Sequence, residues 1–251
     1  MGFMKLLKVA EDIRELGAIL FVGAHPDDEV FTAAGIMAAA VRNGQRVGCV
    51  TATKGEKGVQ DESRWPAEKL AEIRERETME SLEVLGVTQH EWLGYIDGEL
   101  DGMDVDGAVV KLRAAIERFD PDTILTFGPD GLTGHPDHRT ISRWTDLAVA
   151  GRNTRVLWAV TTPEQYEQLR EVDKAANVFF KIDRPPLVNS GDCAVDFRLP
   201  IELTKLKQRA FELIASQTGA IMPLKPFAKP GEALARECFV EGGRGGRGSK
   251  K

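Results

Sequence analysis

Short apolar runs alternate along the chain with longer segments in which apolar residues recur at helical spacing. Most of the apolar runs end in a polar loop, and a helical pattern then follows. This alternation is typical of βαβ units, in which mostly parallel strands form a sheet that helices cover. The runs that predict strands are residues 18–23, 46–53, 90–93, 123–127, 155–160 and 177–182. The segments that predict helices are 30–42, 67–85, 106–119 and 201–217, and one more helix opens at His135.

Two of the polar loops contain histidines, a residue type that is common in catalytic and metal-binding sites. In an open parallel sheet, ligands bind beyond the carboxyl ends of the strands. His25 follows the first predicted strand, and His135 follows the strand at 123–127. The first loop has no Gly-x-Gly-x-x-Gly sequence, so a dinucleotide site is not indicated. We therefore expect an α/β protein with its functional site at this edge of the sheet.

Two matching tetrapeptides hold three of the four histidines in the chain. They read His25-Pro26-Asp27-Asp28 and His135-Pro136-Asp137-His138, and each lies between a predicted strand and a predicted helix. Proline is favoured at the first helical position and aspartate in the first turn, so either tetrapeptide alone is compatible with a purely structural turn. The presence of both at equivalent corners favours a shared site.

The side chains of these two corners include a set of potential metal ligands. A catalytic zinc site needs about three protein ligands from His, Asp or Glu and keeps one position for water. His25, Asp28 and His138 offer two nitrogens and one oxygen. We therefore expect these three residues to bind Zn2+, and Fe2+ or Co2+ could occupy the same ligand set.

The remaining side chains of the tetrapeptides suit acid–base chemistry. Water bound to zinc has a pKa near ~7, and Asp27 is the candidate general base that acts on it. A protonated His135 would stabilise the oxyanion and then protonate a leaving nitrogen. Asp137 would orient His135 or raise its pKa. The reaction that we expect from these residues is the hydrolysis of an amide.

Composition and charge argue against several other classes of protein. Acidic and basic residues are interleaved to a net charge of −6, which gives no nucleic-acid footprint. No apolar stretch reaches the length of a membrane span, and the N-terminus becomes charged too early for a signal peptide. The three cysteines are widely spaced and include no CxxC pair. We expect a cytoplasmic protein whose residues 1–241 form one domain.

The last ten residues differ in composition from the rest of the chain. Residues 242–251 read GGRGGRGSKK, which predicts a flexible tail. An Arg/Gly segment of this kind could also contact RNA or another acidic surface. Residues 185–200 could cover the site or pack against a second subunit, so a homo-oligomer stays open.

The two tetrapeptides and their flanking residues resemble the motifs of a known family. Ala24-His25-Pro26-Asp27-Asp28-Glu29 and Gly134-His135-Pro136-Asp137-His138 are similar to those of the LmbE-like or PIG-L-like N-acetylglucosaminyl deacetylases. The resemblance covers most of residues 17–240. It implies a Rossmann-like three-layer α/β/α fold with a mostly parallel sheet, and zinc held by His25, Asp28 and His138. It also implies Asp27 as the base and His135 as the residue at the oxyanion and leaving group.

The resemblance further implies a class of substrate and the residues that contact it. Family substrates are N-acetylated amino sugars and related glycosides, or amide conjugates of them. Arg74 and Asp97 would then contact sugar hydroxyls, and Thr133 is expected as a further substrate contact. Thr133 stands where some members have a tyrosine that assists the oxyanion, and Ile214 stands where many have a histidine. Other similar segments are residues 53–56 and 93–98, together with Lys207, Ala210 and Ser216-Gln217.

Arg74 and Asp97 each have a structural interpretation as well. Arg74 and Glu77 fall on the same face of the predicted helix 67–85 as its apolar residues. Charged residues are seldom directed toward a core unless they are paired or functional. Arg74 and Glu77 could form an ion pair that fixes the helix, or Glu77 could fix Arg74 in a pocket. Asp97 precedes Gly98 and could belong to an acidic turn.

Other functions would use parts of the same pattern. A two-metal phosphoesterase would need more shared ligands than the two tetrapeptides offer. A sugar- or metabolite-binding protein of the same fold would not need Asp27, which serves chemistry rather than ligation. A hydrolase of amide conjugates would use the same site on a different substrate. A hydrolase of N-acylated amino sugars agrees best with these residues taken together.

Overall fold

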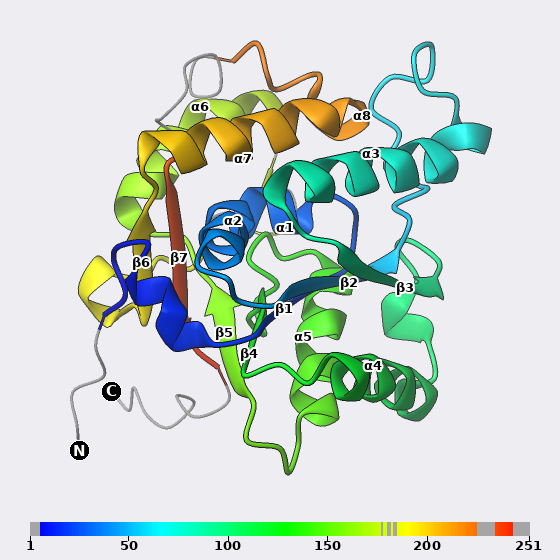
Figure 1. Cartoon of the computed structure of the whole chain (residues 1–251). Helices are drawn as coiled ribbons and strands as arrows, with labels where there is room; N and C mark the ends of the chain where they lie inside the picture. The colour runs from blue at the N-terminus through cyan, green and yellow to red at the C-terminus, as the bar shows by residue number, and fades with distance from the viewer. Residues whose placement is uncertain (1–5, 177, 180–181, 183–184, 225–233, 243–251) are drawn as a thin grey trace.

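The computed structural model describes residues 6–176, 178–179, 182, 185–224 and 234–242. Its strands are β1 (Ile19–Gly23), β2 (Val47–Thr53), β3 (Gln89–Tyr95), β4 (Thr123–Phe127), β5 (Arg155–Ala159), β6 (Val195–Arg198) and β7 (Arg236–Glu241). Within the described residues, these seven strands form one sheet in the order β3-β2-β1-β4-β5-β7-β6 (Figure 1). The first five pair in parallel, whereas β7 runs antiparallel to both β5 and β6.

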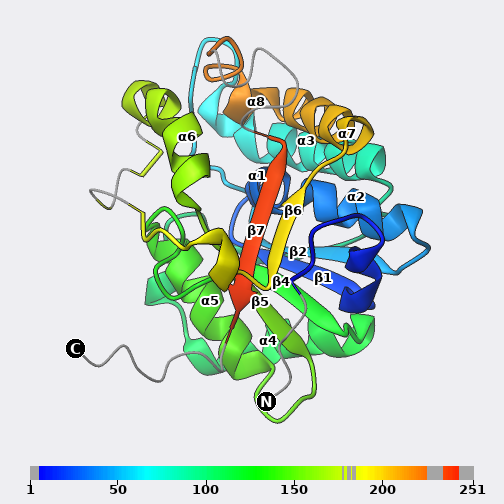
Figure 2. The same cartoon turned by 90° about the vertical axis from the view of Figure 1, so that its left-hand side faces the viewer.

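Helices cover both faces of this sheet. The α-helices are α1 (Asp28–Thr32), α2 (Ala34–Arg42), α3 (Leu70–Leu85), α4 (Val105–Phe119), α5 (Pro136–Ala148), α6 (Pro163–Ala176), α7 (Ile201–Leu213) and α8 (Ala215–Thr218). Short 3-10 helices span Asp12–Leu16, Ala67–Lys69, Leu100–Gly102 and Ser190–Asp192. Figures 1 and 2 show α2, α3 and α7 on one face of the sheet, and α4 and α5 on the other.

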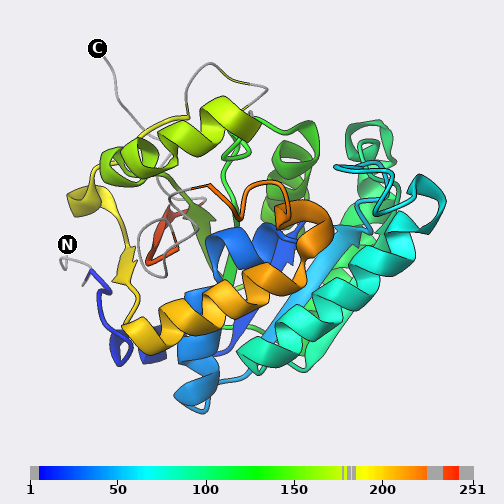
Figure 3. The same cartoon turned by 90° about the horizontal axis from the view of Figure 1, so that it is seen from above.

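The three layers enclose two apolar cores, one on each face of the sheet. Alternate residues of a strand point to opposite faces, and β1 shows this directly. Phe21 packs into the core beneath α2, α3 and α7, while Leu20 and Val22 pack into the core above α4 and α5. Seen from above, α3 and α7 lie side by side across the first face (Figure 3). The predicted three-layer α/β fold with a mostly parallel sheet is therefore confirmed.

Five predicted strands correspond to β1 through β5, but β6, β7 and α6 were not predicted. The two strands read VDFR and RECFVE, and their charged residues hide the apolar pattern. The structure explains how these charges are accommodated inside the fold. Arg236 donates to both carboxylate oxygens of Asp196, at 2.6 and 2.9 Å. An ion pair between side chains of neighbouring strands thus allows charged residues to be buried. The pattern of one strand alone would predict that such residues are exposed.

Two predicted helices are each interrupted at one residue. The helix expected to end at Arg42 divides into α1 and α2 at Ala33, whose φ of −138° is not helical. The C-terminal helix divides into α7 and α8 at Ile214. The first interruption leaves α1 as a short separate helix that begins with Asp28 and contains Phe31.

Some predicted features fall outside the described residues. These are residues 243–251, which make up nearly all of the Gly/Arg tail, and residues 177, 180 and 181 of the strand predicted at 177–182. The described residues 178–179 of that segment form a turn and residue 182 a bend, so the predicted strand is wrong where the structure describes it. Among the helices that are described, none has the length and apolar character that crossing a membrane requires.

A buried ion pair joins the C-terminal part of the chain to the break between α1 and α2. Glu237 in β7 accepts hydrogen bonds from the amides of Gly35 and Ile36 at 2.7 and 2.8 Å. Lys207 in α7 donates to Glu237 at 2.7 Å and to the carbonyl of Phe31 at 3.0 Å. The two charged side chains are 1% and 0% exposed. The pair therefore fixes the end of α1 and the start of α2 relative to the sheet.

We predict that Lys207→Met destabilises the fold, because the Glu237 carboxylate stays buried without its cation. Removing one partner of a buried ion pair costs about 3–5 kcal/mol. Urea unfolding should show a loss of this size for Lys207→Met. The matched variant Lys205→Met, at an exposed position of the same helix, should stay within about 0.5 kcal/mol of wild type. Equal stability of the two variants would contradict this role of the pair.

Candidate metal centre and catalytic site

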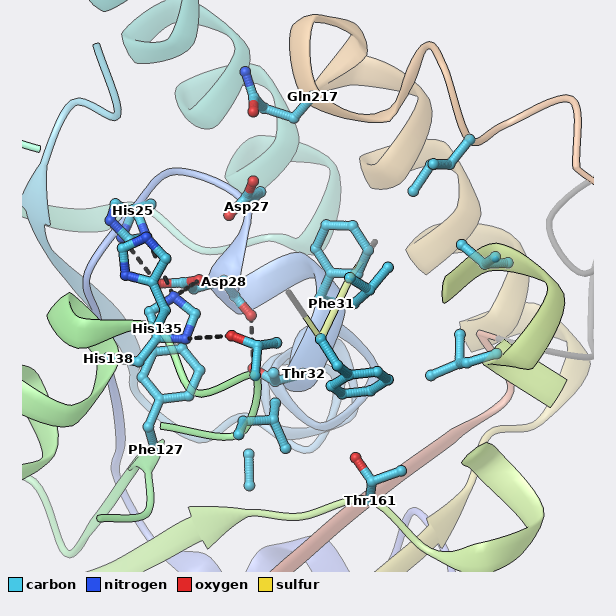
Figure 4. A pocket seen from close by; sticks show the side chains of 18 of the residues that line it. His25, Asp27, Asp28, Phe31, Thr32, Phe127, His135, His138, Thr161 and Gln217 are labelled. Carbon is cyan, nitrogen blue, oxygen red and sulfur yellow. Dashed lines mark hydrogen bonds and ion pairs between the residues drawn. The ribbon is translucent and has the colours of Figure 1, made fainter. Parts of the chain in front are cut away.

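The two strand-to-helix corners meet at the carboxyl edge of the adjacent strands β1 and β4. His25 lies two residues after β1, while His135 is the N-cap residue of α5, with Pro136 as its first residue. The ring centroids of His25, His135 and His138 are 4.7 to 5.2 Å apart. Figure 4 shows these rings as one cluster beside Asp28. The fold thus brings together the side chains that the two tetrapeptides contribute.

Hydrogen bonds on the outer side of two buried rings fix which nitrogen carries a proton. His138 Nδ1 lies 3.0 Å from the carbonyl oxygen of Gly131, which can only accept, so Nδ1 donates. His25 Nε2 lies 3.1 Å from Oδ1 of Asp97 and 3.1 Å from Oδ2 of Asp137, so this nitrogen also donates. In the neutral rings, His138 Nε2 and His25 Nδ1 therefore present lone pairs.

These two lone pairs face each other and a carboxylate oxygen. His25 Nδ1 and His138 Nε2 are 3.2 Å apart, and Asp28 Oδ1 lies 3.3 Å from His138 Nε2. The other carboxylate oxygen of Asp28 accepts from the amides of Ala24 and His25 at 2.7 and 2.8 Å, which holds Oδ1 in this direction. Three atoms with available lone pairs therefore converge at the centre of the site.

A cation suits this convergence, because buried lone pairs that face one another are unfavourable without a positive charge between them. Two imidazole nitrogens and a carboxylate oxygen are ligand types of catalytic zinc. The same charges also shift the pKa values of His25 and Asp28. Burial opposes protonation of His25, but the carboxylates of Asp137 and Asp97 outweigh it and raise the pKa of His25 to about 10. Burial also opposes ionisation of Asp28, yet His138 and His25 hold its pKa well below the usual range.

Asp97 and Asp137 support His25 from outside the cluster. The amide of Lys57 donates to Asp97 at 3.0 Å, and the amide of Gly98 donates to Asp137 at 2.7 Å. Outer carboxylates of this kind fix the orientation and tautomer of a metal-binding histidine. Two further groups of side chains could hold a metal ion, because their potential ligand atoms lie within 4.8 Å of one another. One group is His25, His135 and His138, and the other is His25, Asp97 and Asp137.

The Asp137 carboxylate bonds to a different histidine from the one that we expected it to orient, although its negative charge does act to raise the pKa of His135, as expected. It bonds to His25 and accepts from the amides of Gly98 and Leu100. The hydrogen bond to His135 comes instead from the backbone amide of Asp137, which donates to Nδ1 at 3.1 Å. The reason is helix capping: the N-cap ring of His135 folds over the first turn and accepts from the residue two positions later.

Burial favours the neutral forms of both His135 and Asp27. Burial, together with the neighbouring imidazoles of His25 and His138, lowers the pKa of His135 to about 4, so the ring is uncharged at neutral pH. This differs from the protonated His135 that we expected from the sequence. A neutral ring that accepts at Nδ1 carries its proton on Nε2 and can still donate. Burial raises the pKa of Asp27 to about 6, although Arg74 opposes the increase.

Arg74 holds the corner that carries Asp27. Its buried guanidinium donates to the carbonyl oxygens of Pro26 and Gly55 and to Oδ2 of Asp27, the last at 3.1 Å. Asp27 has a φ of 117°, a backbone conformation that residues with side chains rarely adopt. Strained residues of this kind persist only where their surroundings hold them. The bonds of Arg74 to Pro26 and Asp27 provide such support.

Glu77 does not take the role that its spacing from Arg74 predicts. It accepts hydrogen bonds from the backbone amide of Ser216, at 2.9 Å, and from the hydroxyl of the same residue. The two charged residues on the inner face of α3 therefore serve different contacts. Arg74 supports the corner at Asp27, and Glu77 joins α3 to α8.

Thr133 and Ile214 stand where other members of the resembling family have a tyrosine and a histidine. The Thr133 hydroxyl lies 3.4 Å from Nδ1 of His138, at the border of the cavity. Ile214 is buried in the apolar core at the break between α7 and α8.

A cavity of about 560 Å³ opens beside the histidine cluster (Figure 4). Asp27 and Gln217 border one side of it, while Phe31 and Thr161 lie farther from the cluster. Arg74, Asp97 and Thr133, the predicted substrate contacts, all line this cavity. The apolar part of the lining was not foreseen, because it comes from α6 and from segments around residues 179 and 221 that show no catalytic motif.

Glu29 is a buried acid to which the sequence assigned no role. It is 0% exposed, and burial, reinforced by the negative charges of Asp27 and Asp28, raises its pKa to about 8. One carboxylate oxygen accepts weakly from the amide of Asp27, at 3.4 Å. Glu29 therefore adds little negative charge beneath the cluster at neutral pH.

Comparison with known proteins identifies relatives of the chain. Residues 20–149 match the family model described as GlcNAc-PI de-N-acetylase, PIG-L. A "1D-myo-inositol 2-acetamido-2-deoxy-alpha-D-glucopyranoside deacetylase" of Mycolicibacterium vanbaalenii is 31% identical over 214 residues, which cover 74% of this chain and 75% of that protein. The mycothiol S-conjugate amidase of Streptomyces coelicolor is 36% identical over 153 residues, which cover 53% of this chain and 52% of that protein.

Solved deacetylases share the fold. The N,N'-diacetylchitobiose deacetylase of Pyrococcus horikoshii superposes with a TM-score of 0.61 at 24% identity, and the match covers 91% of this chain and 85% of that one. A deacetylase of the A40926 pseudoaglycone superposes with a TM-score of 0.65 at 19% identity, covering 90% and 97%. At these identities the likeness demonstrates the common fold alone.

We predict that the protein binds about one zinc ion per chain and that His138→Ala loses most of it, because one of three converging ligands is removed. His90→Ala is the matched control, since His90 contacts Thr51 and Trp92 instead of the cluster. Elemental mass spectrometry after zinc reconstitution would measure the metal content of both variants and of wild type. Equal zinc in all three proteins would contradict a metal site at His138.

Proposed function

The chain belongs to the GlcNAc-PI de-N-acetylase (PIG-L) family, and from this premise we propose that it hydrolyses the N-acetyl or another N-acyl amide of a small amino-sugar conjugate. Amide hydrolysis needs a polarised carbonyl, a base for the attacking water and a donor for the charge that develops on oxygen. The strongest support is the convergence of His25 Nδ1, His138 Nε2 and Asp28 Oδ1 within the cavity that Asp27 borders.

We assign His25, Asp28 and His138 to a divalent metal ion. Zinc is the metal whose catalytic sites most often use these ligand types, and Fe2+ or Co2+ suits the same set. When bound, such an ion supplies Lewis acidity and a water whose pKa is lowered to near ~7. The hydrogen bonds of Gly131 and Asp137 support this assignment, because they occupy the outer nitrogens and leave Nδ1 of His25 and Nε2 of His138 directed toward the proposed ion.

Asp27 is the proposed general base. Its pKa of about 6 means that the carboxylate is mostly ionised at pH 7 and still basic enough to accept a proton. Arg74 holds one of its oxygens at 3.1 Å. Asp27 would take a proton from the attacking water and return it to the nitrogen as the C–N bond breaks. The products are then a carboxylic acid and a free amine.

His135 is the proposed hydrogen-bond donor to the substrate oxygen. Its neutral ring carries the proton on Nε2, because Nδ1 accepts from the amide of Asp137. A fixed neutral donor stabilises the negative charge that develops on the carbonyl oxygen in the transition state. With a pKa of about 4, His135 is a poor source of a proton at neutral pH, so we assign delivery of the proton to Asp27.

The named relatives define the substrates to test first. One is a deacetylase of an N-acetylglucosaminyl inositol, and another is an amidase of mycothiol S-conjugates. The first name describes the acetamide of an amino sugar, and the second describes the amide of a thiol conjugate. We propose that Arg74 and Thr133, with Asp97 behind His25, border the sugar of such a substrate.

We predict that Asp27→Asn loses turnover by about 10²- to 10⁴-fold, the usual contribution of a positioned general base, while it keeps its metal. Release of acetate from the N-acetylglucosaminyl inositol and from N,N'-diacetylchitobiose would measure turnover of the zinc-loaded protein. Asp101→Asn, at an exposed position, is the matched control and should retain full activity. Wild-type turnover in Asp27→Asn, at unchanged metal content, would remove Asp27 as the base.

A further inference from the structure

The cavity has two chemically different ends. Near the histidine cluster, Asp27 and Gln217 give it a polar border. Beyond Phe31 the cavity continues between α6 and the segment that follows α8. The walls of this second part are apolar and include Leu169, Val172, Phe179, Ile221 and Leu234.

Phe31 marks the boundary between the two ends. Its side chain is 38% exposed although it lines the cavity, and its ring packs edge-on against Phe211 at 4.8 Å. In Figure 4 the ring lies between Asp28 and the apolar side chains at the far end. An aromatic ring that is held by the core and exposed within a cavity offers contact area to a bound apolar group.

Apart from the hydroxyl of Thr161, the polar side chains that line the apolar end among the described residues are already bonded within the protein. Gln165 accepts from the amide of Thr162 at 3.0 Å and donates to the carbonyl of Arg236 at 3.1 Å. Arg236 is occupied by both oxygens of Asp196. Glu237 is neutralised by the buried lysine of α7 and by two amides. These groups offer little to a hydroxyl-rich ligand, so the far end favours an apolar one.

We propose that this end receives the acyl chain of the substrate, and that the protein prefers N-acyl groups of about four to eight carbons over N-acetyl. The proposal rests on the function proposed above and specifies its substrate. The amide of such a substrate joins a hydroxyl-bearing amine half to an acyl half, and the two extend in different directions from the reacting carbonyl. If the hydroxyl-bearing half contacts the polar border at Asp27 and Gln217, the acyl half extends past Phe31. An acetyl group would leave these apolar walls in contact with water.

The direct test compares N-hexanoylglucosamine with N-acetylglucosamine on the zinc-loaded protein. Each methylene removed from water is worth about 0.8 kcal/mol, or about fourfold. Four extra methylenes should therefore raise kcat/KM by at least about tenfold, even if burial is incomplete. The hexyl glycoside of N-acetylglucosamine carries a similar chain on the other half of the molecule. It should show no comparable gain.

Leu169→Trp narrows the apolar end without touching the histidine cluster. It should reduce the hexanoyl advantage to below about threefold and leave N-acetyl hydrolysis within about twofold of wild type. Leu147→Trp, at an exposed position of α5 outside the cavity, is the matched control and should change neither value. The chain-length series on wild type decides the same question if Leu169→Trp fails to fold.

A binding measurement separates recognition from turnover. Calorimetry on Asp27→Asn should give a more negative heat-capacity change for N-hexanoylglucosamine than for N-acetylglucosamine, as burial of apolar surface requires. Equal kcat/KM for the two amides, or a gain for the hexyl glycoside alone, would overturn the acyl-chain proposal and leave the amide hydrolase in place. Cleavage of neither these amides nor the N-acetylglucosaminyl inositol would instead overturn the proposed function itself.

Discussion

The site depends on the convergence of three lone pairs, from His25, His138 and Asp28, at the carboxyl edge of the sheet. Each of these atoms is directed inward by a bond on its outer side. Asp137 occupies the far nitrogen of His25, and Gly131 occupies that of His138. Buried groups that converge in this way need a positive charge between them, which a proton on His25 or a bound metal ion supplies, and this need links the fold to the proposed chemistry.

The fold keeps this arrangement rigid from two directions. β1 and β4 are neighbours in the sheet, so the corners that follow them are necessarily close. Helix α1, which carries the proposed ligand Asp28, is fixed at its far end by Lys207 and Glu237. Those residues come from α7 and β7, so the C-terminal part of the chain positions a motif near the N-terminus. The same C-terminal part also supplies walls of the cavity, among them Arg236 and Glu237.

The sequence predicted the parallel part of the sheet and the meeting of both tetrapeptides, because strand-to-helix corners have local signals in proline and aspartate. It could not predict partners that depend on three-dimensional packing. Asp137 was assigned to His135 and contacts His25, and Glu77 was assigned to Arg74 and contacts α8. β7 was missed because its charges are paired across strands. A charge that is satisfied by a residue far away in the chain looks exposed in any local pattern.

The most direct measurement is a crystal structure of the zinc-loaded protein with anomalous scattering recorded at the zinc edge. We predict a single zinc bonded to Nδ1 of His25, Nε2 of His138 and a carboxylate oxygen of Asp28, at ~2.0–2.2 Å. Asp137 should remain on the outer nitrogen of His25. Zinc bonded to His135, or held between Asp97 and Asp137, would contradict the proposed centre and the roles derived from it.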